Sequence, residues 1–304
     1  MGWFSKPEVV ILKETSDAEE YLLQLENRAK EAKGETAKRI AKEITNVKAG
    51  ISGEKNILFE LKNSGMDMVV LHDIYLESEA GHTAQIDFLV LTPKINLVLE
   101  CKNLFGNIEI TRKGEFIRRV EYGGKTHREG FYSPITQNQR HLQVLKECRS
   151  EKCSKLMSFL KNRWFDDFYK GLIVLSNSKT IVDDEGAPQK IRDQVIRADQ
   201  LVAKIQQMNR SSKESAVSLK ELVEWGKRYL EMSKKNPTNY LEKFMAAEEE
   251  ASHDDLPPEP KKEERCPRCG GLLVLRKAKQ GATAGTKFWG CKNYPQCKYT
   301  KRLE

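Results

Sequence analysis

Apolar and polar positions repeat with two different periods along the chain, and these periods predict its elements. Near the N-terminus, Ser16-Asp-Ala-Glu19 has the form of a capping box, and apolar residues follow at helical spacing, so a charged amphipathic helix is predicted over much of residues 16–47. From about residue 52 the pattern changes to a mixture of helices and strands. The expected helices are 52–63, 134–148 and 219–245, and the expected strands are 68–75, 83–91, 97–102 and 171–176.

The order of these segments predicts an α/β fold in four parts. Residues 1–49 are expected to form an N-terminal helical arm, and residues 50–245 a mixed sheet flanked by helices, with a helical C-terminal part. Residues 246–265 are charged and proline-bearing with almost nothing to bury, which is typical of a linker. Residues 266–304 form a short module that contains four cysteines.

The composition is that of a soluble protein. Hydrophobic residues make up 39% and charged residues 32% of the 304 positions. No apolar run approaches the roughly 20 residues that a membrane-spanning helix needs. The N-terminus has no small-residue cleavage site of the kind that ends a signal peptide, so a cytoplasmic location is expected.

The net charge of +8 is concentrated at the C-terminus. Residues 266–304 contain nine Lys or Arg residues against one acid, whereas residues 1–265 contain 43 of each sign. Four thiolates on one Zn²⁺ would offset part of this charge. The tail is still the basic part of the chain, and phosphate groups of a nucleic acid are the expected partner.

Four of the seven cysteines have metal-ligand spacing. Cys266-Pro-Arg-Cys269-Gly-Gly places two thiolates on a tight turn, and Cys291 and Cys297 supply a second pair. Four soft ligands satisfy tetrahedral Zn²⁺ and leave no open position, so the predicted zinc site is structural. The remaining cysteines are expected to be buried apolar residues or free thiols: Cys101, Cys148 and Cys153.

Aromatic and basic residues alternate around the predicted zinc site. Aromatic faces stack on bases while lysines bind phosphates, so this mixture predicts a surface for single-stranded nucleic acid. The alternative is that the aromatic residues are the small core of the module. The candidate nucleic-acid-binding residues are Lys287, Phe288, Trp289, Lys292, Tyr294, Lys298 and Tyr299.

The cysteine segment resembles a known zinc finger. The sequence Cys266-Pro-Arg-Cys269-Gly-Gly and the later Phe288-Trp-Gly-Cys291-Lys-Asn-Tyr-Pro-Gln-Cys297 are similar to the C-terminal zinc fingers of bacterial type IA topoisomerases. The resemblance covers residues 266 to about 300. It implies contact with DNA and nothing about strand passage.

Two apolar strands around Thr92-Pro-Lys-Ile-Asn96 carry acids that the register brings together. If the turn centres on residues 93 and 94, Asp87 lies opposite Glu100, with Cβ atoms about 5 Å apart. Adjacent buried carboxylates repel each other unless a cation or a proton intervenes, so Mg²⁺ or Mn²⁺ is expected there. Lys102 lies on the same face as Glu100, although a simple ion pair between strands would also explain it.

A third acid comes from the preceding helix. Glu54, Leu58 and Leu61 follow helical spacing, so Glu54 belongs to the core-facing stripe. A role in the metal site would explain a glutamate there. The alternative is a favourable charge in the first turn of a helix that begins near residue 52.

These residues occur in an order that resembles the nuclease-related domain (NERD) of the PD-(D/E)XK superfamily, whose fold is restriction-endonuclease-like. The motifs are Gly53-Glu54, Gln85-Ile-Asp87, Glu100-Cys-Lys102-Asn103 and Ser133-Pro-Ile-Thr-Gln137, with Ser133 where Asn is commoner. The resemblance implies the following roles: metal-site acids Glu54, Asp87 and Glu100, a metal ligand from the main-chain carbonyl of Cys101, the catalytic Lys102, and Gln137 near the site.

The sequence thus predicts a Mg²⁺- or Mn²⁺-dependent nuclease that hydrolyses DNA phosphodiester bonds. A non-catalytic DNA-binding or DNA-processing accessory protein is the alternative, and a protein-interaction scaffold is a third. The histidines lack ligand spacing and are expected to be ordinary polar residues, with a substrate contact considered for His82 alone: His72, His82, His127 and His141.

Overall fold

The computed structural model describes residues 6–151, 163–242, 244, 265–278 and 286–302. The chain divides into two compact units, Met1–Glu242 and Lys243–Glu304. The expected linker lies outside the described residues except for Arg265, and Cys153 lies outside them as well. No helix in the described part of the chain is both long and apolar enough to cross a membrane.

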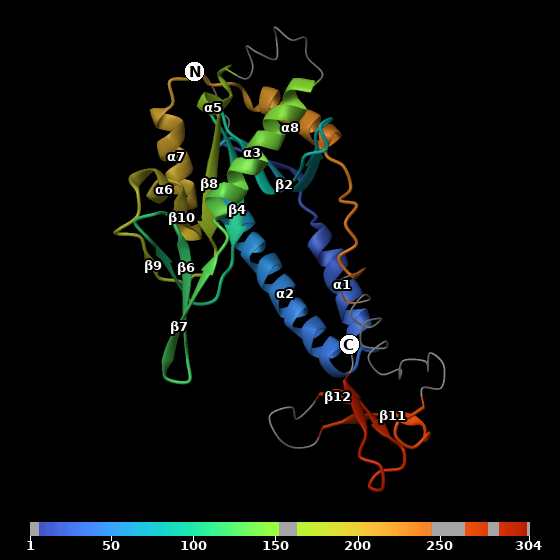
Figure 1. The fold of residues 1–304 in the computed structure, drawn as a ribbon. Helices are drawn as coiled ribbons and strands as arrows, with labels where there is room; N and C mark the ends of the chain where they lie inside the picture. Colours follow the sequence, from blue (N-terminus) through green and yellow to red (C-terminus); the bar gives the residue numbers. More distant parts are fainter. Residues whose placement is uncertain (1–5, 152–162, 243, 245–264, 279–285, 303–304) are drawn as a thin grey trace, which may run out of the picture. The chain divides into compact units, whose positions relative to one another are not determined.

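The first unit mixes strands and helices along its length (Figure 1). In chain order its elements are β1 (Val9–Lys13), α1 (Asp17–Ala29), α2 (Gly34–Lys62), β2 (Met68–Glu77), β3 (Thr83–Leu91), β4 (Asn96–Lys102), β5 (Asn107–Ile110), β6 (Phe116–Tyr122), β7 (Lys125–Phe131), α3 (Pro134–Glu151), α5 (Phe165–Phe168), β8 (Tyr169–Leu175), β9 (Val182–Asp183), α6 (Gln189–Arg192), β10 (Val195–Arg197), a 3-10 turn (Ala198–Gln200), α7 (Leu201–Ser211) and α8 (Leu219–Met232).

Six strands form the main sheet in the order β1-β2-β3-β4-β8-β10. β2, β3 and β4 are antiparallel neighbours, whereas β1 is parallel to β2, and β8 is parallel to both β4 and β10. The sheet is therefore mixed, as predicted. The parallel pairing of β4 with β8 requires a long crossover, which passes through the small second sheet and α3.

Helices cover both faces of the main sheet, because side chains alternate along each strand. On one face, Val70 and Phe88 pack with Leu61 of α2 and Ile205 of α7. On the other face, Leu89 and other strand residues pack with residues of α3 and α8. The result is an α/β fold with three layers.

A second sheet has the strand order β7-β6-β5-β9. β6 and β7 form a hairpin that projects away from the main sheet in Figure 1, and every residue of β7 except Phe131 is exposed. Three of its strands, β5, β6 and β7, lie between β4 and α3 in the sequence and so follow directly on the strand that carries Glu100 and Lys102, whereas β9 comes after β8.

The N-terminal region differs from the predicted helical arm. Ser16 caps α1 by accepting a hydrogen bond from the Ala18 N–H, but Glu19 pairs with Lys55 instead of completing a capping box. Two helices replace the single one expected, and α2 continues through residue 49 without a break. β1 is a sheet strand inside the expected arm. Its short apolar run is stable there because β2 supplies hydrogen-bonding partners along its edge.

The second unit contains three antiparallel strands, β11 (Leu273–Lys277), β12 (Lys287–Cys291) and β13 (Thr300–Arg302). The apolar cluster among its described residues consists of Cys266, Cys291 and Cys297, with Leu273 and Tyr299 packed against them. A core this small needs a further source of stability, such as a metal.

Candidate functional site

The register of β3 and β4 is the one that the sequence predicts. Phe88 lies opposite Leu99, and each following pair keeps the same offset as far as Leu91 and Asn96. The turn between them is closed by a hydrogen bond from the Thr92 N–H to the Ile95 carbonyl. The next pair along this register would be Asp87 and Glu100, where the ladder ends.

At Asp87 a side-chain hydrogen bond replaces the backbone hydrogen bonds between β3 and β4. Its Oδ2 accepts a hydrogen bond of 2.7 Å from the Cys101 N–H, in the place where a strand carbonyl would otherwise serve. The half-buried Asp87 carboxylate is therefore fixed beside the start of the Glu100-Cys101-Lys102 segment.

Glu54 reaches the same region because α2 packs tightly against β4. A Cβ atom on Gly53 would lie 2.4 Å from Ser176 Oγ and 2.7 Å from Asn103 Cβ, so only glycine permits this approach. As the helical spacing predicts, Leu58 and Leu61 are buried in the core between α2 and the main sheet. Glu54 itself lies well inside α2 rather than in its first turn, so the helix-dipole explanation for this residue fails.

Lys102 lies between an acid and an amide. Its Nζ is 2.5 Å from Glu100 Oε1 and donates a hydrogen bond of 3.1 Å to Gln137 Oε1. Gln137 is placed by α3, which is tied to the sheet through its neighbour Asn138, whose Nδ2 donates to the carbonyls of Val98 and Leu172. The Pro-x-x-Gln segment is therefore close to the Glu-x-Lys segment in space.

Two histidines belong to this cluster, contrary to the prediction that they are ordinary polar residues. His72 Nε2 is 2.9 Å from Glu54 Oε2, and His72 Nδ1 is 2.7 Å from the Glu14 carbonyl. A carbonyl and a carboxylate both only accept, so each ring nitrogen carries a proton in this arrangement, and the two hydrogen bonds hold the ring in one orientation. His72 also stacks on Phe88, with ring centres 4.6 Å apart.

The second histidine is His141, one helical turn beyond Gln137 on α3. Its Nδ1 is 3.4 Å from Glu100 Oε2, and neither atom has a hydrogen-bond partner among the described residues. The i, i+4 spacing from Gln137 is the signal that would have identified His141 in the sequence. His72 had no comparable signal, because β2 meets α2 only in the tertiary structure.

Burial and mutual repulsion disturb the ionisation of the cluster. Burial, together with the charges of Glu100 and Glu54, raises the pKa of Asp87 well above its usual range. Burial also raises the pKa of Glu100, although the ammonium of Lys102 opposes the shift. Burial and the charge of Lys102 lower the pKa of His141 to about 4, so this ring is neutral at pH 7.

His72 is shifted in the opposite direction. Burial alone would lower the pKa of His72, but the hydrogen bonds to Glu54 and to the Glu14 carbonyl outweigh it and raise the pKa. Cys101 plays no part as a thiolate, because burial and the charge of Asp87 raise the pKa of its thiol. The Cys101 side chain instead packs toward the core, with Sγ 3.5 Å from Ser176 Oγ.

Other candidate residues lie away from this cluster. His82 is exposed and pairs with Glu147 at 2.9 Å. Gln85 donates to Asp73 and accepts from Asn236, so it serves a structural network.

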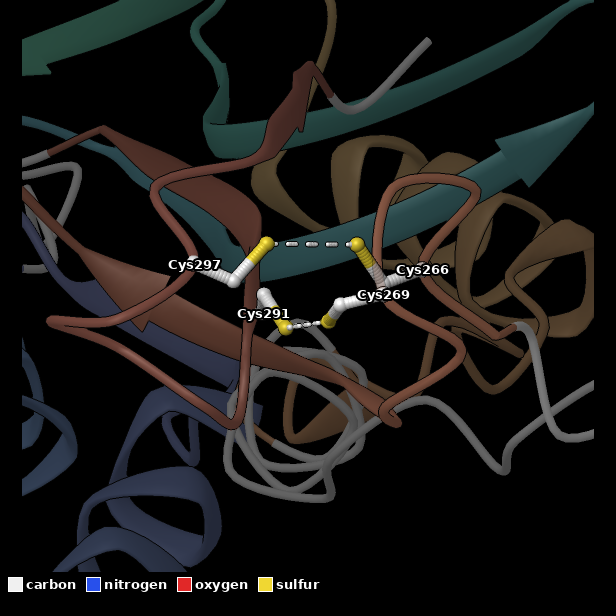
Figure 2. Close-up of side chains that lie close together, drawn as sticks. All are labelled: Cys266, Cys269, Cys291 and Cys297. Carbon is white, nitrogen blue, oxygen red and sulfur yellow. Dashed lines mark hydrogen bonds between the residues drawn. The ribbon is translucent and has the colours of Figure 1, made fainter.

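The four cysteines form a much tighter group than the acids (Figure 2). Cys266 Sγ is 3.7 Å from Cys297 Sγ, and Cys269 Sγ is 3.3 Å from Cys291 Sγ. Sulfurs at the corners of a Zn²⁺ tetrahedron with bonds near 2.3 Å are about 3.8 Å apart, whereas a disulfide is about 2.05 Å long. The cysteines therefore form a zinc-ribbon site, as predicted. Within the described residues they are the one group of three or more His, Cys, Asp or Glu side chains whose ligand atoms all lie within 4.8 Å.

Backbone geometry builds the first cysteine turn. The Cys266 N–H donates to the Gly271 carbonyl, the Gly270 N–H donates to the Cys266 carbonyl, and Gly270 has φ of 71°. A hydrogen bond from the Gly271 backbone and the neighbouring thiols lower the pKa of Cys269 to about 7, which favours the thiolate that zinc needs.

The aromatic residues of the ribbon divide between its core and its surface. Tyr299 packs against the cysteines, whereas Tyr294 is 59% exposed and lies beside the Arg276 guanidinium at 5.5 Å. Phe288 and Trp289 on β12 are half-buried. Basic residues surround these two rings: Arg276 and Arg302 lie opposite Phe288, and Lys301 lies opposite Trp289. The side chains of Lys287, Lys292 and Lys298 are exposed.

Comparison with known proteins finds relatives of both regions. Residues 263–304 match the topoisomerase DNA binding C4 zinc finger family. DNA topoisomerase 1 of Methanocaldococcus jannaschii is 51% identical over 46 residues, and that of Archaeoglobus fulgidus is 51% identical over 39 residues. These segments cover 15% and 13% of this chain and 5% of each topoisomerase, so the similarity is confined to the ribbon.

The first unit matches a different family. Residues 49–176, which include Glu54, Asp87, Glu100, Lys102 and Gln137, match the nuclease-related domain family. No solved structure matches the chain. The chain therefore carries a nuclease-related domain in its first unit and a topoisomerase-type C4 zinc ribbon at its C-terminus.

Proposed function

We propose that this chain is a metal-dependent nuclease that hydrolyses DNA phosphodiester bonds and that its zinc ribbon binds nucleic acid. The observation that carries the proposal is Lys102, which is held between Glu100 and Gln137 at the C-terminal end of the interior strand β4, where the charge of Glu54 and the side chain of Asp87 also converge. The positively charged ammonium of Lys102 lies beside several acids that come from strands and a helix. This arrangement is suited to binding and hydrolysing a phosphodiester.

The acids fit a divalent cation. Glu100 Oε2 is buried without a hydrogen-bond partner in the described part of the chain, and a buried carboxylate oxygen requires a cation or a proton. Burial is the main cause of the raised pKa values of Asp87 and Glu100, and the charges of neighbouring acids add to it; a bound cation would offset both effects. Glu54, Asp87, Glu100 and the main-chain carbonyl of Cys101 would hold Mg²⁺ or Mn²⁺. When bound, the cation supplies activation of water and stabilisation of negative charge on the phosphate.

The other side chains orient the reacting groups. The ammonium of Lys102 would bind the phosphate oxygens and stabilise the charge that develops during attack. Gln137 accepts a hydrogen bond from Lys102 and so limits its rotamers. His72 holds the Glu54 carboxylate through Nε2, as a positioning residue.

The zinc ribbon would supply affinity for nucleic acid. Its exposed lysines are suited to phosphates, and the rings of Phe288, Trp289 and Tyr294 are suited to bases. Tyr299 contributes less to binding, because it packs against the cysteines.

A cleavage assay tests the enzyme. We expect the full chain to cut plasmid or linear DNA with Mg²⁺ or Mn²⁺ and to stop when EDTA is added. Asp87→Asn and Lys102→Ala should reduce the cleavage rate at least about 10²-fold while DNA binding is retained. Lys170→Ala is the matched control, because Lys170 lies on the neighbouring strand β8 opposite Leu97. It should cut at the wild-type rate.

A non-catalytic DNA-binding or DNA-processing accessory protein is the second candidate. It is favoured by the looser arrangement of the acids, since within the described residues only the cysteines meet as a ready-made metal site. If purified protein with either metal leaves supercoiled, linear and single-stranded DNA and RNA intact, the nuclease proposal fails. Retained DNA binding would then support the accessory role.

A further inference from the structure

The buried ring of His141 faces one of the candidate metal ligands. His141 is 8% exposed, and its Nδ1 has no hydrogen-bond partner among the described residues. Buried nitrogen and oxygen atoms of proteins are nearly always hydrogen-bonded, so an unpaired one needs an explanation. The atom that faces His141 Nδ1 is Oε2 of Glu100, at 3.4 Å.

Glu100 Oε2 lacks a partner as well. Glu100 is 2% exposed, and the described part of the chain offers its Oε2 no hydrogen bond. A carboxylate oxygen accepts and a ring nitrogen can donate, so each atom supplies what the other needs. The distance of 3.4 Å exceeds the usual upper limit of about 3.2 Å for an N–H···O hydrogen bond by little. A small movement of either side chain therefore forms this bond.

The other oxygen of Glu100 is already held from the same helix. Oε1 lies 2.5 Å from Lys102 Nζ, which donates a hydrogen bond of 3.1 Å to Gln137 Oε1. Gln137 and His141 are four residues apart on α3, so their side chains share one face of the helix. This face of α3 thus approaches both oxygens of Glu100, Oε1 through Lys102 and Oε2 directly.

α3 is fixed to the sheet beside this face. Asn138 is buried, and its Nδ2 donates to the carbonyls of Val98 at 2.9 Å and Leu172 at 3.3 Å. The helix approaches so closely that a Cβ atom on Gly171 would lie 2.8 Å from Asn138 Nδ2. Val98 is two residues before Glu100 on β4, so this anchor sets the position of α3 relative to Glu100.

We propose that His141 is a positioning residue: its Nδ1–H donates to Glu100 Oε2 and holds the carboxylate in the orientation in which Glu100 binds a divalent cation. The inference rests on the proposed metal-dependent function and adds to it a residue that acts through a metal ligand. Each carboxylate oxygen has two lone pairs, so hydrogen bonds to Lys102 and His141 leave capacity for the cation. Residues that hydrogen-bond to metal ligands orient them, and their loss typically weakens metal binding about 10–100-fold.

The test is a calorimetric titration of the zinc-loaded full chain with Mn²⁺, without nucleic acid. We expect His141→Leu to weaken Mn²⁺ binding at least about tenfold. His141→Asn should recover most of the affinity, because asparagine Nδ2 takes the place of histidine Nδ1. His82→Leu, at an exposed histidine that pairs with Glu147, is the matched control and should bind Mn²⁺ as the wild type does.

Cleavage kinetics give a second readout. In His141→Leu the Mn²⁺ concentration for half-maximal cleavage should rise by the same factor as the dissociation constant. The rate at saturating Mn²⁺ should fall less than about threefold, because the bound cation itself then fixes the carboxylate. A merely structural defect would instead lower the rate at every Mn²⁺ concentration and would contradict the proposal.

Two binding results would also overturn the proposal. One is unchanged Mn²⁺ affinity in folded His141→Leu. The other is equal weakening in the Leu and Asn variants, which would make the volume of the ring the cause. If thermal unfolding shows that the Leu variant is not folded, His141→Gln takes its place, since its amide extends beyond the position of Nδ1 and should bind Mn²⁺ weakly.

Failure of this inference can be told apart from failure of the nuclease proposal. If the wild type and the variants bind Mn²⁺ as expected but the wild type cuts no DNA, the nuclease proposal fails and the role of His141 in metal binding is supported. If the wild type cuts DNA with Mn²⁺ and His141→Leu has the wild-type Mn²⁺ affinity, the role of His141 fails alone. A wild type that binds no Mn²⁺ would overturn both.

Discussion

The two candidate metal sites of this chain are built in opposite ways. In the ribbon, four cysteines within 32 residues of sequence supply every ligand, and their sulfurs already lie at tetrahedral spacing. In the first unit, the acids come from α2, β3 and β4. Glu54 and Asp87 are each held by a contact from another element, whereas Glu100 is held by Lys102 of its own strand. A structural site can be local and depend on the metal for its fold, whereas a site for chemistry needs a scaffold that folds without the metal.

The largest expected effect comes from removing zinc. Chelation or Cys266→Ser should unfold the second unit, because zinc binding contributes about 10–16 kcal/mol to modules of this kind at neutral pH. The thermal transition of the first unit should not change. Metal analysis and limited proteolysis measure both results. Cys148→Ala, which removes a cysteine from α3, should retain one zinc; loss of zinc in that variant would contradict the assignment.

The next effect concerns the approach of α2 to β4. Gly53→Ala should destabilise the first unit by about 1–3 kcal/mol, because its Cβ would overlap with Ser176 and Asn103. Urea unfolding measures the loss. Gly50→Ala, on the same helix with nothing within 4 Å of an added Cβ, is the control and should gain up to about 1 kcal/mol. Equal effects of the two substitutions would mean that the close packing around Gly53 is unimportant.

A smaller effect tests a carboxylate outside the metal cluster. Burial would raise the pKa of Asp73, but hydrogen bonds from Gln85 and the Asp17 N–H and the charge of Lys13 outweigh it and lower the pKa. Its stabilisation is therefore present above the unfolded pKa of about 3.9 and is lost as the pH falls through the folded value.

Asp73→Asn should accordingly cost about 1–2 kcal/mol at pH 7, and the difference from the wild type should shrink below about pH 4. Asparagine tolerates the positive φ of 54° at this position, so the change isolates the charge. Unfolding free energies across pH 3–7 measure it. The exposed Asp166→Asn serves as control; a pH-independent difference for Asp73→Asn would contradict the assignment.

The smallest effect concerns a single lysine of the ribbon. Lys298→Gln should reduce the slope of log affinity for DNA against log salt concentration by about 0.7–1, as one phosphate contact is lost. Fluorescence anisotropy at several salt concentrations measures the slope. Lys220→Gln, on α8 of the first unit, should leave the slope unchanged. An unchanged slope in Lys298→Gln would show that Lys298 makes no contact with a DNA phosphate.

The sequence alone determined the features that depend on local spacing. The cysteine turns, four of the six strands of the main sheet (β2, β3, β4 and β8) and the register of β3 with β4 follow from short-range patterns and one turn, and these were predicted. The predicted boundaries agree with the observed ones within a few residues for β2, β3, β4, β8 and α3. Local geometry is sufficient for these features because the residues concerned are neighbours in the chain.

Only the tertiary structure decided the remaining features, because they join segments far apart in sequence. Residues 9–13, four of them apolar, become β1 only when β2 offers its edge, and the helical arm is instead two helices, the second of which continues into the nuclease-related domain. The contact of His72 with Glu54 and the close approach of Gly53 to Ser176 arise from packing between elements. No periodicity in the chain encodes such contacts, since they depend on how α2, α3 and α8 pack on the sheet.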